Sequence, residues 1–317
     1  MPAKGAASAM SSRSGEDRRI DDTRAPHHPA PMPELPEVET VRRMLSEHVP
    51  GRRIARAEVS RHRLRTTSLA KLPGQLEGRT FGLPRRTGKF LFLDLEGEAT
   101  LLSHLGMSGR WLFWPAGSET EDSLAHVHLR LTFTDGAKLW YQDIRRFGML
   151  RVVALDALAR DPSVRLLGPD PLVARPDGAT LRALAKGSRV AVKNFLLDQR
   201  RIAGIGNIYA SEILFLARVS PRRRAGTLAL ADWSAIAEQI PLVLEASIAR
   251  MGTTFSTYRT IWNEPGEYGD QLLVYDRAGQ PCANCRGPVK RLVQGGRATF
   301  WCPVCQRTGG RGTTEAR

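Results

Sequence analysis

The chain has 317 residues, and its 47 lysines and arginines exceed its 32 aspartates and glutamates to give a formal net charge of +15. The length allows two domains, the 42% hydrophobic content excludes general disorder, and no apolar run approaches the ~20 residues of a membrane span. We therefore expect a soluble protein whose basic excess favours a polyanionic partner, most commonly nucleic acid.

Residues 1–31 are rich in Ala, Ser, Pro, Arg and Asp and almost free of large apolar side chains. Such a segment cannot bury enough surface to offset its ordering entropy, so it is predicted to be a disordered extension. It lacks the apolar core of a secretory signal, and its acidic residues argue against a transit peptide. The stretch MPELPEVET, which follows at Met32, has the form of a protein start.

Residues 32–160 are predicted to form an antiparallel β-sandwich capped by a helix. Helical spacing begins at Leu35, and Pro36 suits a first turn, where its missing N–H is not needed. Strand-like runs follow at 90–95, 99–106, 110–114 and 128–144, with no regular helix between them. The last run contains Asp135-Gly136 between apolar stretches, which indicates a hairpin turn.

The second half of the chain is predicted to be helical and to end in a metal-binding segment. Residues 161–178 are rich in Pro and Gly and indicate a linker, and the period from 179 to 268 is helical. Residues 269–307 contain every cysteine of the chain, and residues 308–317 form a polar tail. The predicted class is therefore an α+β multidomain protein.

The cysteines are spaced as the ligands of a structural zinc ion. Cys282 and Cys285, like Cys302 and Cys305, are separated by two residues, and 16 residues divide the two pairs. Four thiolates at this spacing hold one tetrahedral Zn²⁺ over a hairpin, whereas disulfides would be spread through a small secreted domain. The alternative is four unligated thiols. Arg297 follows the predicted turn of the hairpin.

The segment GIGN, residues 204–207, precedes a predicted helix that starts near Asn207. Glycines before a helix N-terminus expose backbone N–H groups that suit a phosphate, and Asn207 could cap the helix or donate to a phosphate oxygen. A plain helical hairpin with a capping Asn explains the spacing equally well. The lack of a following Lys-Ser/Thr excludes a nucleotide-binding P-loop.

Six segments occur in the order found in bacterial formamidopyrimidine-DNA glycosylases, and the chain resembles that family from Pro33 to Cys305. They are PELPEVETVRR at 33–43, TGKF at 87–90, SHLGMSG at 103–109, DIRRFG at 143–148, LLDQRRIAGIGNIYASE at 196–212 and the four-cysteine finger. The resemblance implies a β-sandwich joined to a helix–two-turn–helix domain, residues 179–268, and a zinc finger. It also implies a glycosylase that removes oxidised purines from double-stranded DNA and cuts the strand at abasic sites.

The resemblance assigns four catalytic positions. Pro33 matches the nucleophile that attacks the sugar C1′ through its backbone nitrogen, and Glu34 matches the general acid/base at the sugar. Lys89 matches a residue that supports β-elimination, and Arg297 one linked to the second elimination. Glu37, one turn after Glu34, can lie on the same face of the helix and take part in proton transfer. An ordinary carboxylate in the first turn of a helix explains Glu37 equally well.

The resemblance also assigns DNA contacts. Lys193 and Asn207 match phosphate-contacting positions. Met107, Arg145 and Phe147 match the side chains that fill the gap left by an extruded base, which an enzyme acting on a duplex must flip out. Two further matches, His126 and Arg189, are basic contacts, the second on a loose alignment.

This chain departs from the family at two points. Ile144 stands where the family usually has proline, and residues 253–271 differ from the usual lesion-recognition loop. Two alternatives therefore stay open. One is an endonuclease VIII-like enzyme for oxidised pyrimidines. Such enzymes usually begin with PEGPE, whereas this chain has PELPE, which favours the purine enzyme. The other is a zinc-bearing DNA-binding protein without catalysis, against which Pro33, Glu34 and Lys89 together argue.

A reactive Pro33 would require a free amine, because a peptide-bonded proline nitrogen is not basic. We therefore expect translation to begin at Met32, with the methionine then removed, or a protease to cleave before Pro33. If residues 1–31 are retained, a binding role replaces the catalytic one. The family resemblance further implies a monomer in the bacterial cytoplasm, associated with the nucleoid.

Overall fold

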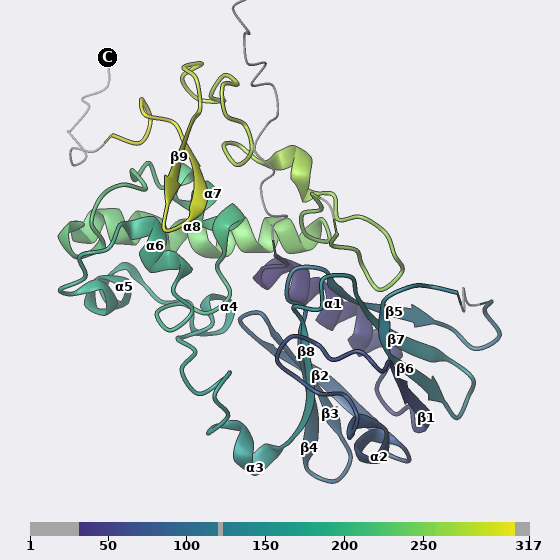
Figure 1. Ribbon diagram of the computed structural model, residues 1–317. Coiled ribbons are helices and arrows are strands. Elements are labelled where there is room, and N and C mark those ends of the chain that lie inside the picture. The colour runs from purple at the N-terminus through teal and green to yellow at the C-terminus, as the bar shows by residue number, and fades with distance from the viewer. Residues whose placement is uncertain (1–31, 120–122, 256, 308–317) are drawn as a thin grey trace, which may run out of the picture.

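The computed structural model describes residues 32–119, 123–255 and 257–307 and has two domains, a β-sandwich and a helical domain that carries a β-hairpin (Figure 1). This is the predicted α+β class. The predicted extension 1–31 and tail 308–317 lie outside the described residues. Among the described residues, no helix is long and apolar enough to cross a membrane.

The sandwich consists of two four-stranded antiparallel sheets. One has the order β1-β6-β7-β5, formed by Ile54–Val59, Val127–Phe133, Lys138–Asp143 and Gly109–Trp114. The other has the order β2-β3-β4-β8, formed by Phe81–Thr87, Phe90–Leu95, Ala99–His104 and Met149–Ala154. Inward-facing apolar side chains of both sheets form one core, which includes Trp111, Phe133 and Leu101.

The predicted strands β3, β4 and β5 agree with the structure, as does the β6–β7 hairpin. Its turn contains Gly136 at φ 87°, a conformation that glycine adopts without strain, and the Asp135 carboxylate accepts a hydrogen bond from the Ala137 N–H (3.0 Å). The sequence patterns did not reveal β1, β2 and β8, because arginines and a proline interrupt their apolar alternation.

Helix α1 (Leu35–His48) joins the two domains. Leu35 packs in the core of the helical domain, whereas Val38, Val41 and Leu45 pack in the core of the sandwich. Figure 1 shows α1 between the sheets and the long helix α8 (Leu230–Ala249). The short helix α2 (Leu72–Leu76) covers the sandwich, and α3 (Leu155–Leu158) and α4 (Pro171–Ala174) lie in the connection between domains.

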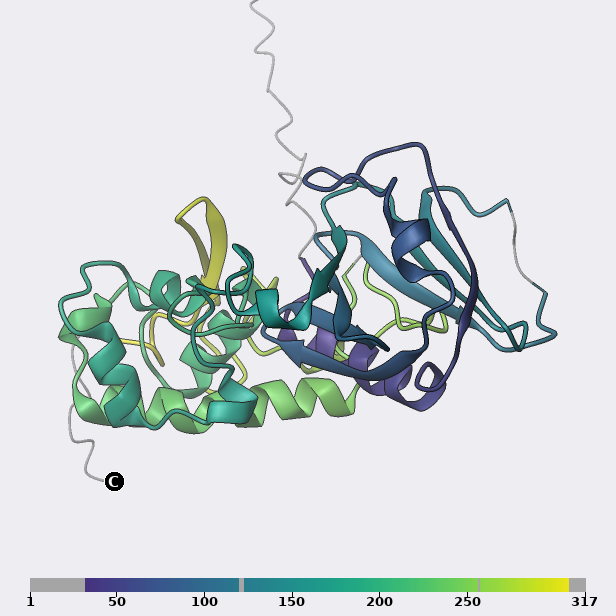
Figure 2. The ribbon, with the colours of Figure 1, turned by 90° about the horizontal axis from the view of Figure 1, so that it is seen from below.

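The helical domain is built around α7 (Asn207–Leu216), whose residues 208–215 are all buried. Helices α6 (Val192–Leu197) and α8 pack against it, and α5 (Gly178–Ala185) packs against α8, with 3₁₀ turns η1 (Ala225–Thr227) and η2 (Tyr268–Gln271) between elements. The hairpin β9 (Lys290–Gln294) and β10 (Arg297–Trp301) projects from the side of the domain opposite α8 (Figure 2). Gly295 and Gly296 form its two-residue turn at φ 54° and 72°, as predicted.

Candidate active site

A cavity of about 790 Å³ lies where the two domains meet. Its walls come from the start of α1, the β2–β3 turn, the β4–β5 loop, the start of α7 and the β9–β10 hairpin. The structure thereby brings together five of the residues singled out from the sequence, although some are far apart along the chain. They are Glu34, Lys89, Met107, Asn207 and Arg297.

Glu34 is buried at the point where α1 meets the N-terminus of α7. Its carboxylate accepts hydrogen bonds from the backbone N–H groups of Ile208 (2.9 Å) and Tyr209 (3.4 Å). Burial raises the pKa of Glu34 to about 7, with Glu37 adding to the rise and Lys89 opposing it. A carboxyl group with this pKa can give or take a proton near neutral pH.

The glycines of the GIGN segment allow this approach. A Cβ on Gly206 would lie 2.2 Å from the Glu34 Cδ, and one on Gly204, at φ 97°, would lie 2.5 Å from the Leu35 Cδ1. Two N–H groups at the α7 N-terminus therefore serve the protein's own carboxylate, and the binding of a phosphate there stays a prediction. The helix begins at Asn207, as expected.

Glu37 forms a second buried carboxylate beside Glu34. It accepts hydrogen bonds from the backbone N–H groups of Glu34 (2.8 Å) and Thr253 (2.8 Å) and from the Tyr209 hydroxyl. Burial raises its pKa, although these donors oppose the rise. Pro33 is buried next to it and lines a small hollow together with Glu37 and Thr253, and Met32 lines both this hollow and the main cavity.

Lys89 enters the cavity from the two-residue turn between β2 and β3. Gly88, the other turn residue, has φ 57°, and a Cβ there would lie 2.9 Å from the Ala203 Cβ, so this position also requires glycine. Lys89 is buried, and burial lowers its pKa, as does Arg297, whereas the two carboxylates, Glu34 first, raise it. A lysine of this kind can exchange a proton more readily than an exposed one.

Lys193 and Asn207 tie the helical domain to the hairpin. The Lys193 ammonium, which is fully buried, donates to the Asn207 Oδ1 (2.5 Å), the Ala298 carbonyl (2.9 Å) and the Thr299 hydroxyl (2.7 Å). The Asn207 amide also donates to the Ala298 carbonyl (2.9 Å). Burial lowers the pKa of Lys193 to about 7. Asn207 lines the cavity, and Lys193 lies behind it, with three acceptors inside the protein.

Two loops on the sandwich carry the predicted gap-filling side chains. Ser108 links them, because its hydroxyl donates to Asp143 (2.6 Å) and accepts from the Arg145 N–H (2.8 Å). Met107 lines the cavity, and Arg145 and Phe147 are exposed. The Arg145 guanidinium lies 5.0 Å from the centre of the Phe147 ring. The three side chains thus lie on two connected loops.

The remaining predicted DNA contacts are exposed residues outside the cavity lining. His126 precedes β6 at φ 62°, and its carbonyl accepts a hydrogen bond from the Asp143 N–H (3.0 Å). Arg189 lies in the loop between α5 and α6. The structure leaves both side chains accessible but does not join them to the residues in the cavity.

The four cysteines converge beside the hairpin, and their sulfur atoms all lie within 4.8 Å of one another. The Cys282–Cys305 and Cys285–Cys302 sulfur distances are 3.8 and 3.4 Å. A tetrahedral zinc ion with Zn–S bonds of about 2.3 Å requires sulfur separations of about 3.8 Å. The site therefore fits one structural zinc ion, which would hold the base of the hairpin that carries Arg297.

His104 is a cavity residue that the sequence reasoning did not assign. It ends β4, and its Nδ1 accepts a hydrogen bond from the Gly106 N–H (3.0 Å). Burial, with Lys89 nearby, lowers its pKa to about 4, so the ring is neutral at pH 7. Tyr275 also lines the cavity and packs edge-on against Phe300, 5.0 Å away. The SHLGMSG segment contained His104, but only the fold brings it next to Lys89.

Three family models match the chain. The formamidopyrimidine-DNA glycosylase N-terminal domain matches residues 32–150, the H2TH domain of the same enzymes matches 167–259, and the zinc finger found in FPG and IleRS matches 279–308. With the cleft between the domains, these matches define the class of protein: a DNA-repair glycosylase with a zinc finger.

Full-length relatives agree with this class. Formamidopyrimidine-DNA glycosylase of Methylococcus capsulatus is 45% identical over 276 residues, which cover 87% of this chain and all of the relative. The chain belongs to the formamidopyrimidine-DNA glycosylase family.

Solved structures of Lactococcus lactis FPG are similar as well. A G226P mutant in complex with Fapy-dG-containing DNA has 31% identity and a TM-score of 0.79 and covers 87% of this chain and 100% of that one. The wild-type protein in complex with DNA containing an oxidised pyrimidine has 30% identity and a TM-score of 0.78 over the same shares. These likenesses concern the whole two-domain arrangement rather than one domain.

Proposed function

We propose that this protein excises oxidised purines, 8-oxoguanine and formamidopyrimidines, from double-stranded DNA and then cleaves the strand at the resulting abasic site. The observation that carries the proposal is the arrangement at the start of α1. Pro33 and Glu34 directly precede α1, and Glu37 lies in its first turn; Glu34 and Lys89 share one cavity, and the matching family model starts at residue 32.

The first step is nucleophilic attack. The Pro33 nitrogen bonds to C1′ and gives up its proton to the base, whose bond to C1′ breaks with the electron pair leaving on the base. Glu34, with its pKa of about 7, then protonates O4′ as the sugar ring opens, which leaves a C1′ iminium on the Pro33 nitrogen. The position of Pro33 at a helix N-terminus favours its neutral, nucleophilic form, since the helix dipole disfavours positive charge there.

The second step is elimination. The iminium acidifies C2′, a base removes the proton, and the 3′ phosphate leaves. Lys89 is suited to this stage, because its lowered pKa allows proton exchange and its turn enters the cavity beside Glu34. A second elimination releases the 5′ phosphate, with Arg297 at the hairpin tip near the departing charge, and water then frees the Pro33 nitrogen from the sugar fragment.

DNA binding in this proposal uses both domains. Met107, Arg145 and Phe147 fill the gap left by the extruded base, and their two loops are joined through Ser108. Phosphate contacts come from side chains and from the hairpin that zinc holds; the candidates are His126, Arg189, Lys193 and Asn207. Lys193 can contribute through Asn207, whose Oδ1 it binds.

The proposal requires the active protein to begin at Pro33. A peptide bond from Met32 makes the Pro33 nitrogen planar and non-basic, and Met32 itself lines the cavity. N-terminal mass spectrometry of active protein tests this requirement, with a form that keeps Met32 as the matched control. We expect the Pro33 form to be trapped on DNA by borohydride and the Met32 form not to be. Trapping at another amine would contradict the proposal.

A second candidate is excision of oxidised pyrimidines, favoured by the similar L. lactis FPG bound to DNA with such a lesion. Duplexes containing 8-oxoguanine, thymine glycol or an abasic site, each with and without borohydride, separate the candidates. Faster excision of 8-oxoguanine supports the purine assignment, and faster excision of thymine glycol supports the pyrimidine one. Binding without trapping on any of the three would indicate a non-catalytic protein.

A further inference from the structure

A second groove, of about 430 Å³, lies away from the catalytic cavity, where α1, β2, α4 and α8 meet. Five arginines and two glutamates contribute to its lining. Helix α8 runs along the side of the molecule opposite the β9–β10 hairpin (Figure 2). The groove and the catalytic cavity have no lining residue in common. The lining is Glu39, Arg42, Arg43, Pro84, Arg85, Arg86, Leu172, Val173, Arg175 and Glu245.

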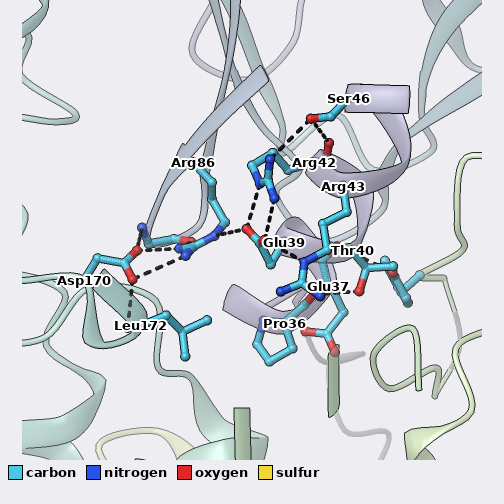
Figure 3. Close-up of polar contacts among 12 residues, drawn as sticks. Pro36, Glu37, Glu39, Thr40, Arg42, Arg43, Ser46, Arg86, Asp170 and Leu172 are labelled. Atoms are coloured by element: carbon cyan, nitrogen blue, oxygen red, sulfur yellow. Dashed lines mark hydrogen bonds and ion pairs between the residues drawn. The ribbon is translucent and has the colours of Figure 1, made fainter. Parts of the chain in front are cut away.

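The floor of the groove is a fixed charge cluster around Glu39. Figure 3 shows three guanidinium groups, those of Arg42, Arg43 and Arg86, converging on its carboxylate. Burial alone would raise the pKa of Glu39, but these hydrogen bonds lower it to about 2. One negative charge therefore faces three positive charges, and Glu39 stays ionised at every physiological pH.

Two of these arginines use most of their donors inside the protein. Arg86 is buried and also donates to Asp170, the residue that caps α4 (Figure 3). Arg42 binds both oxygens of Glu39 and the Ser46 hydroxyl. The Arg86 side chain is 4% exposed and that of Arg42 27%, against 57% for Arg43, so these two arginines form the base of the groove.

The outer arginines keep unused donors. Arg43 uses only its Nε, on Glu39 (2.9 Å), and 57% of its side chain is exposed. Arg175 uses one Nη, on Glu245 (2.6 Å), and is 62% exposed. Within the part of the chain that the structure describes, the remaining guanidinium N–H groups of both have no protein acceptor. Such edges match the geometry of a carboxylate or a phosphate.

The rim adds an apolar component. Val173 is 78% exposed and lines the groove, and Leu83, two residues before Arg85 on β2, is 67% exposed on the same face of the strand. Phosphate groups of a nucleic-acid backbone gain nothing from such side chains. A peptide with both acidic and apolar side chains gains from both components, because aliphatic contacts add to the paired charges.

Ion pairs hold both ends of α4, which contributes Leu172 and Val173 to the groove. Arg175 ends α4 in the left-handed region, at φ 41° and ψ 57°, where a residue with a Cβ is strained by about 1 kcal/mol or more. Its pairing with Glu245 ties this end of α4 to α8, and Asp170 ties the other end to Arg86. A preformed site binds with a smaller entropic cost than one that must be ordered.

From these contacts we infer that this groove is a docking site for an extended acidic segment of a partner protein, with carboxylates on Arg43 and Arg175 and apolar side chains on Val173 and Leu83. The partner would reach the glycosylase from the side opposite the hairpin, so docking and DNA binding are compatible.

Fluorescence anisotropy with a short labelled peptide of alternating acidic and leucine residues tests the inference in about 0.15 M salt, where weak surface attraction is screened. The same peptide with amides in place of its carboxylates, and a lesion-free DNA duplex, serve as comparison probes. The double variant Arg43→Gln/Arg175→Gln should weaken peptide binding by about tenfold or more, because it removes two charge-assisted contacts.

The matched control is Arg56→Gln/Arg160→Gln, which removes the same charge from exposed arginines outside the groove. Peptide affinity should match the wild type in this control, and lesion excision from an oligonucleotide should be unchanged in both variants. Three outcomes would overturn the inference. The first is that the wild type does not bind the acidic peptide, and the second is that both double variants lose peptide affinity equally. The third is that Arg43→Gln/Arg175→Gln weakens binding of the DNA duplex more than binding of the peptide.

Discussion

Helix α1 holds buried carboxylates of two opposite kinds, one in the cleft and one in the groove on its other side. Glu34, 2% exposed, meets backbone N–H groups and Lys89, and its pKa rises to about 7. Glu39, 7% exposed, meets three arginines, and its pKa falls to about 2. Of these two buried carboxylates, one is a proton carrier and the other a permanent charge, because their neighbours differ.

The largest effect should follow from Glu34→Gln. Glutamine keeps the size of the side chain but cannot protonate the opening sugar, so single-turnover excision should slow by roughly 10²–10⁴-fold. In the wild type the rate should fall as pH rises through about 7, where Glu34 loses its proton, and the variant should lack this limb. Affinity for a duplex with a stable abasic-site analogue should change little. A variant with the wild-type rate and pH profile would remove Glu34 from the mechanism.

Glu39→Gln should have the opposite outcome, with excision within about twofold of wild type and a large loss of stability. Leaving Arg42, Arg86 and their neighbours around a neutral side chain should cost about 3 kcal/mol in the free energy of unfolding at pH 7. Urea unfolding followed by circular dichroism measures this loss.

The same pair of proteins gives a pH test. Folding lowers the pKa of Glu39, so its stabilisation is present above pH 4.5 and is lost as pH falls through about 2. The stability gap between the wild type and Glu39→Gln should therefore narrow across this range. A constant gap would mean that the charge of Glu39 is not what stabilises the fold.

Glu34→Gln should make the protein more stable at alkaline pH, although less active. Folding raises the pKa of Glu34 from 4.5 to about 7, so its favourable contribution is present below pH 4.5 and is lost as pH rises through 7. Removing the buried charge should raise the free energy of unfolding at pH 8 by on the order of 2 kcal/mol and by little at pH 4. Equal stability of variant and wild type at both pH values would contradict the raised pKa.

The smallest effect should come from Arg43→Gln. Arg43 is 57% exposed, and Arg42 and Arg86 still hold Glu39 after its loss. The expected cost is about 0.5 kcal/mol, as for other exposed ion pairs. Thermal unfolding of Arg43→Gln and Glu39→Gln compares the exposed member of the cluster with its centre. A loss near 3 kcal/mol in the free energy of unfolding of Arg43→Gln would show that the cluster acts as one unit.

The sequence predicted those features that depend on local patterns. Alternating apolar residues indicated β3 to β7 apart from their exact ends, glycine pairs indicated the hairpin turn at Gly295-Gly296, and cysteine spacing indicated the zinc site. Each signal lies within a few residues of the structure it specifies. Strands β1, β2 and β8 were missed because arginines, and in β2 a proline, interrupt their apolar alternation, and only pairing with neighbours in the sheet defines them.

The pKa values and charge contacts in the cavity could not be predicted in this way. The pKa of Glu34 depends on Ile208 and Tyr209, which lie more than 170 positions away, and on their approach past Gly206. The family resemblance supplied a role for Glu34 but not its environment. The same holds for Lys193, whose three acceptors come from α7 and β10.

The division of α1 between two cores also bears on how the chain is made. Leu35 leaves the ribosome well before the side chains that form its core, such as Ile205 and Ile208, are synthesised. At about 5–20 residues per second this delay is on the order of ten seconds. During that time the sandwich can fold around Val38 and Val41 while the start of α1 stays uncovered. A nascent or truncated chain therefore has no assembled site with which to cut the genome, and DNA-cleaving chemistry arises only when synthesis is nearly complete.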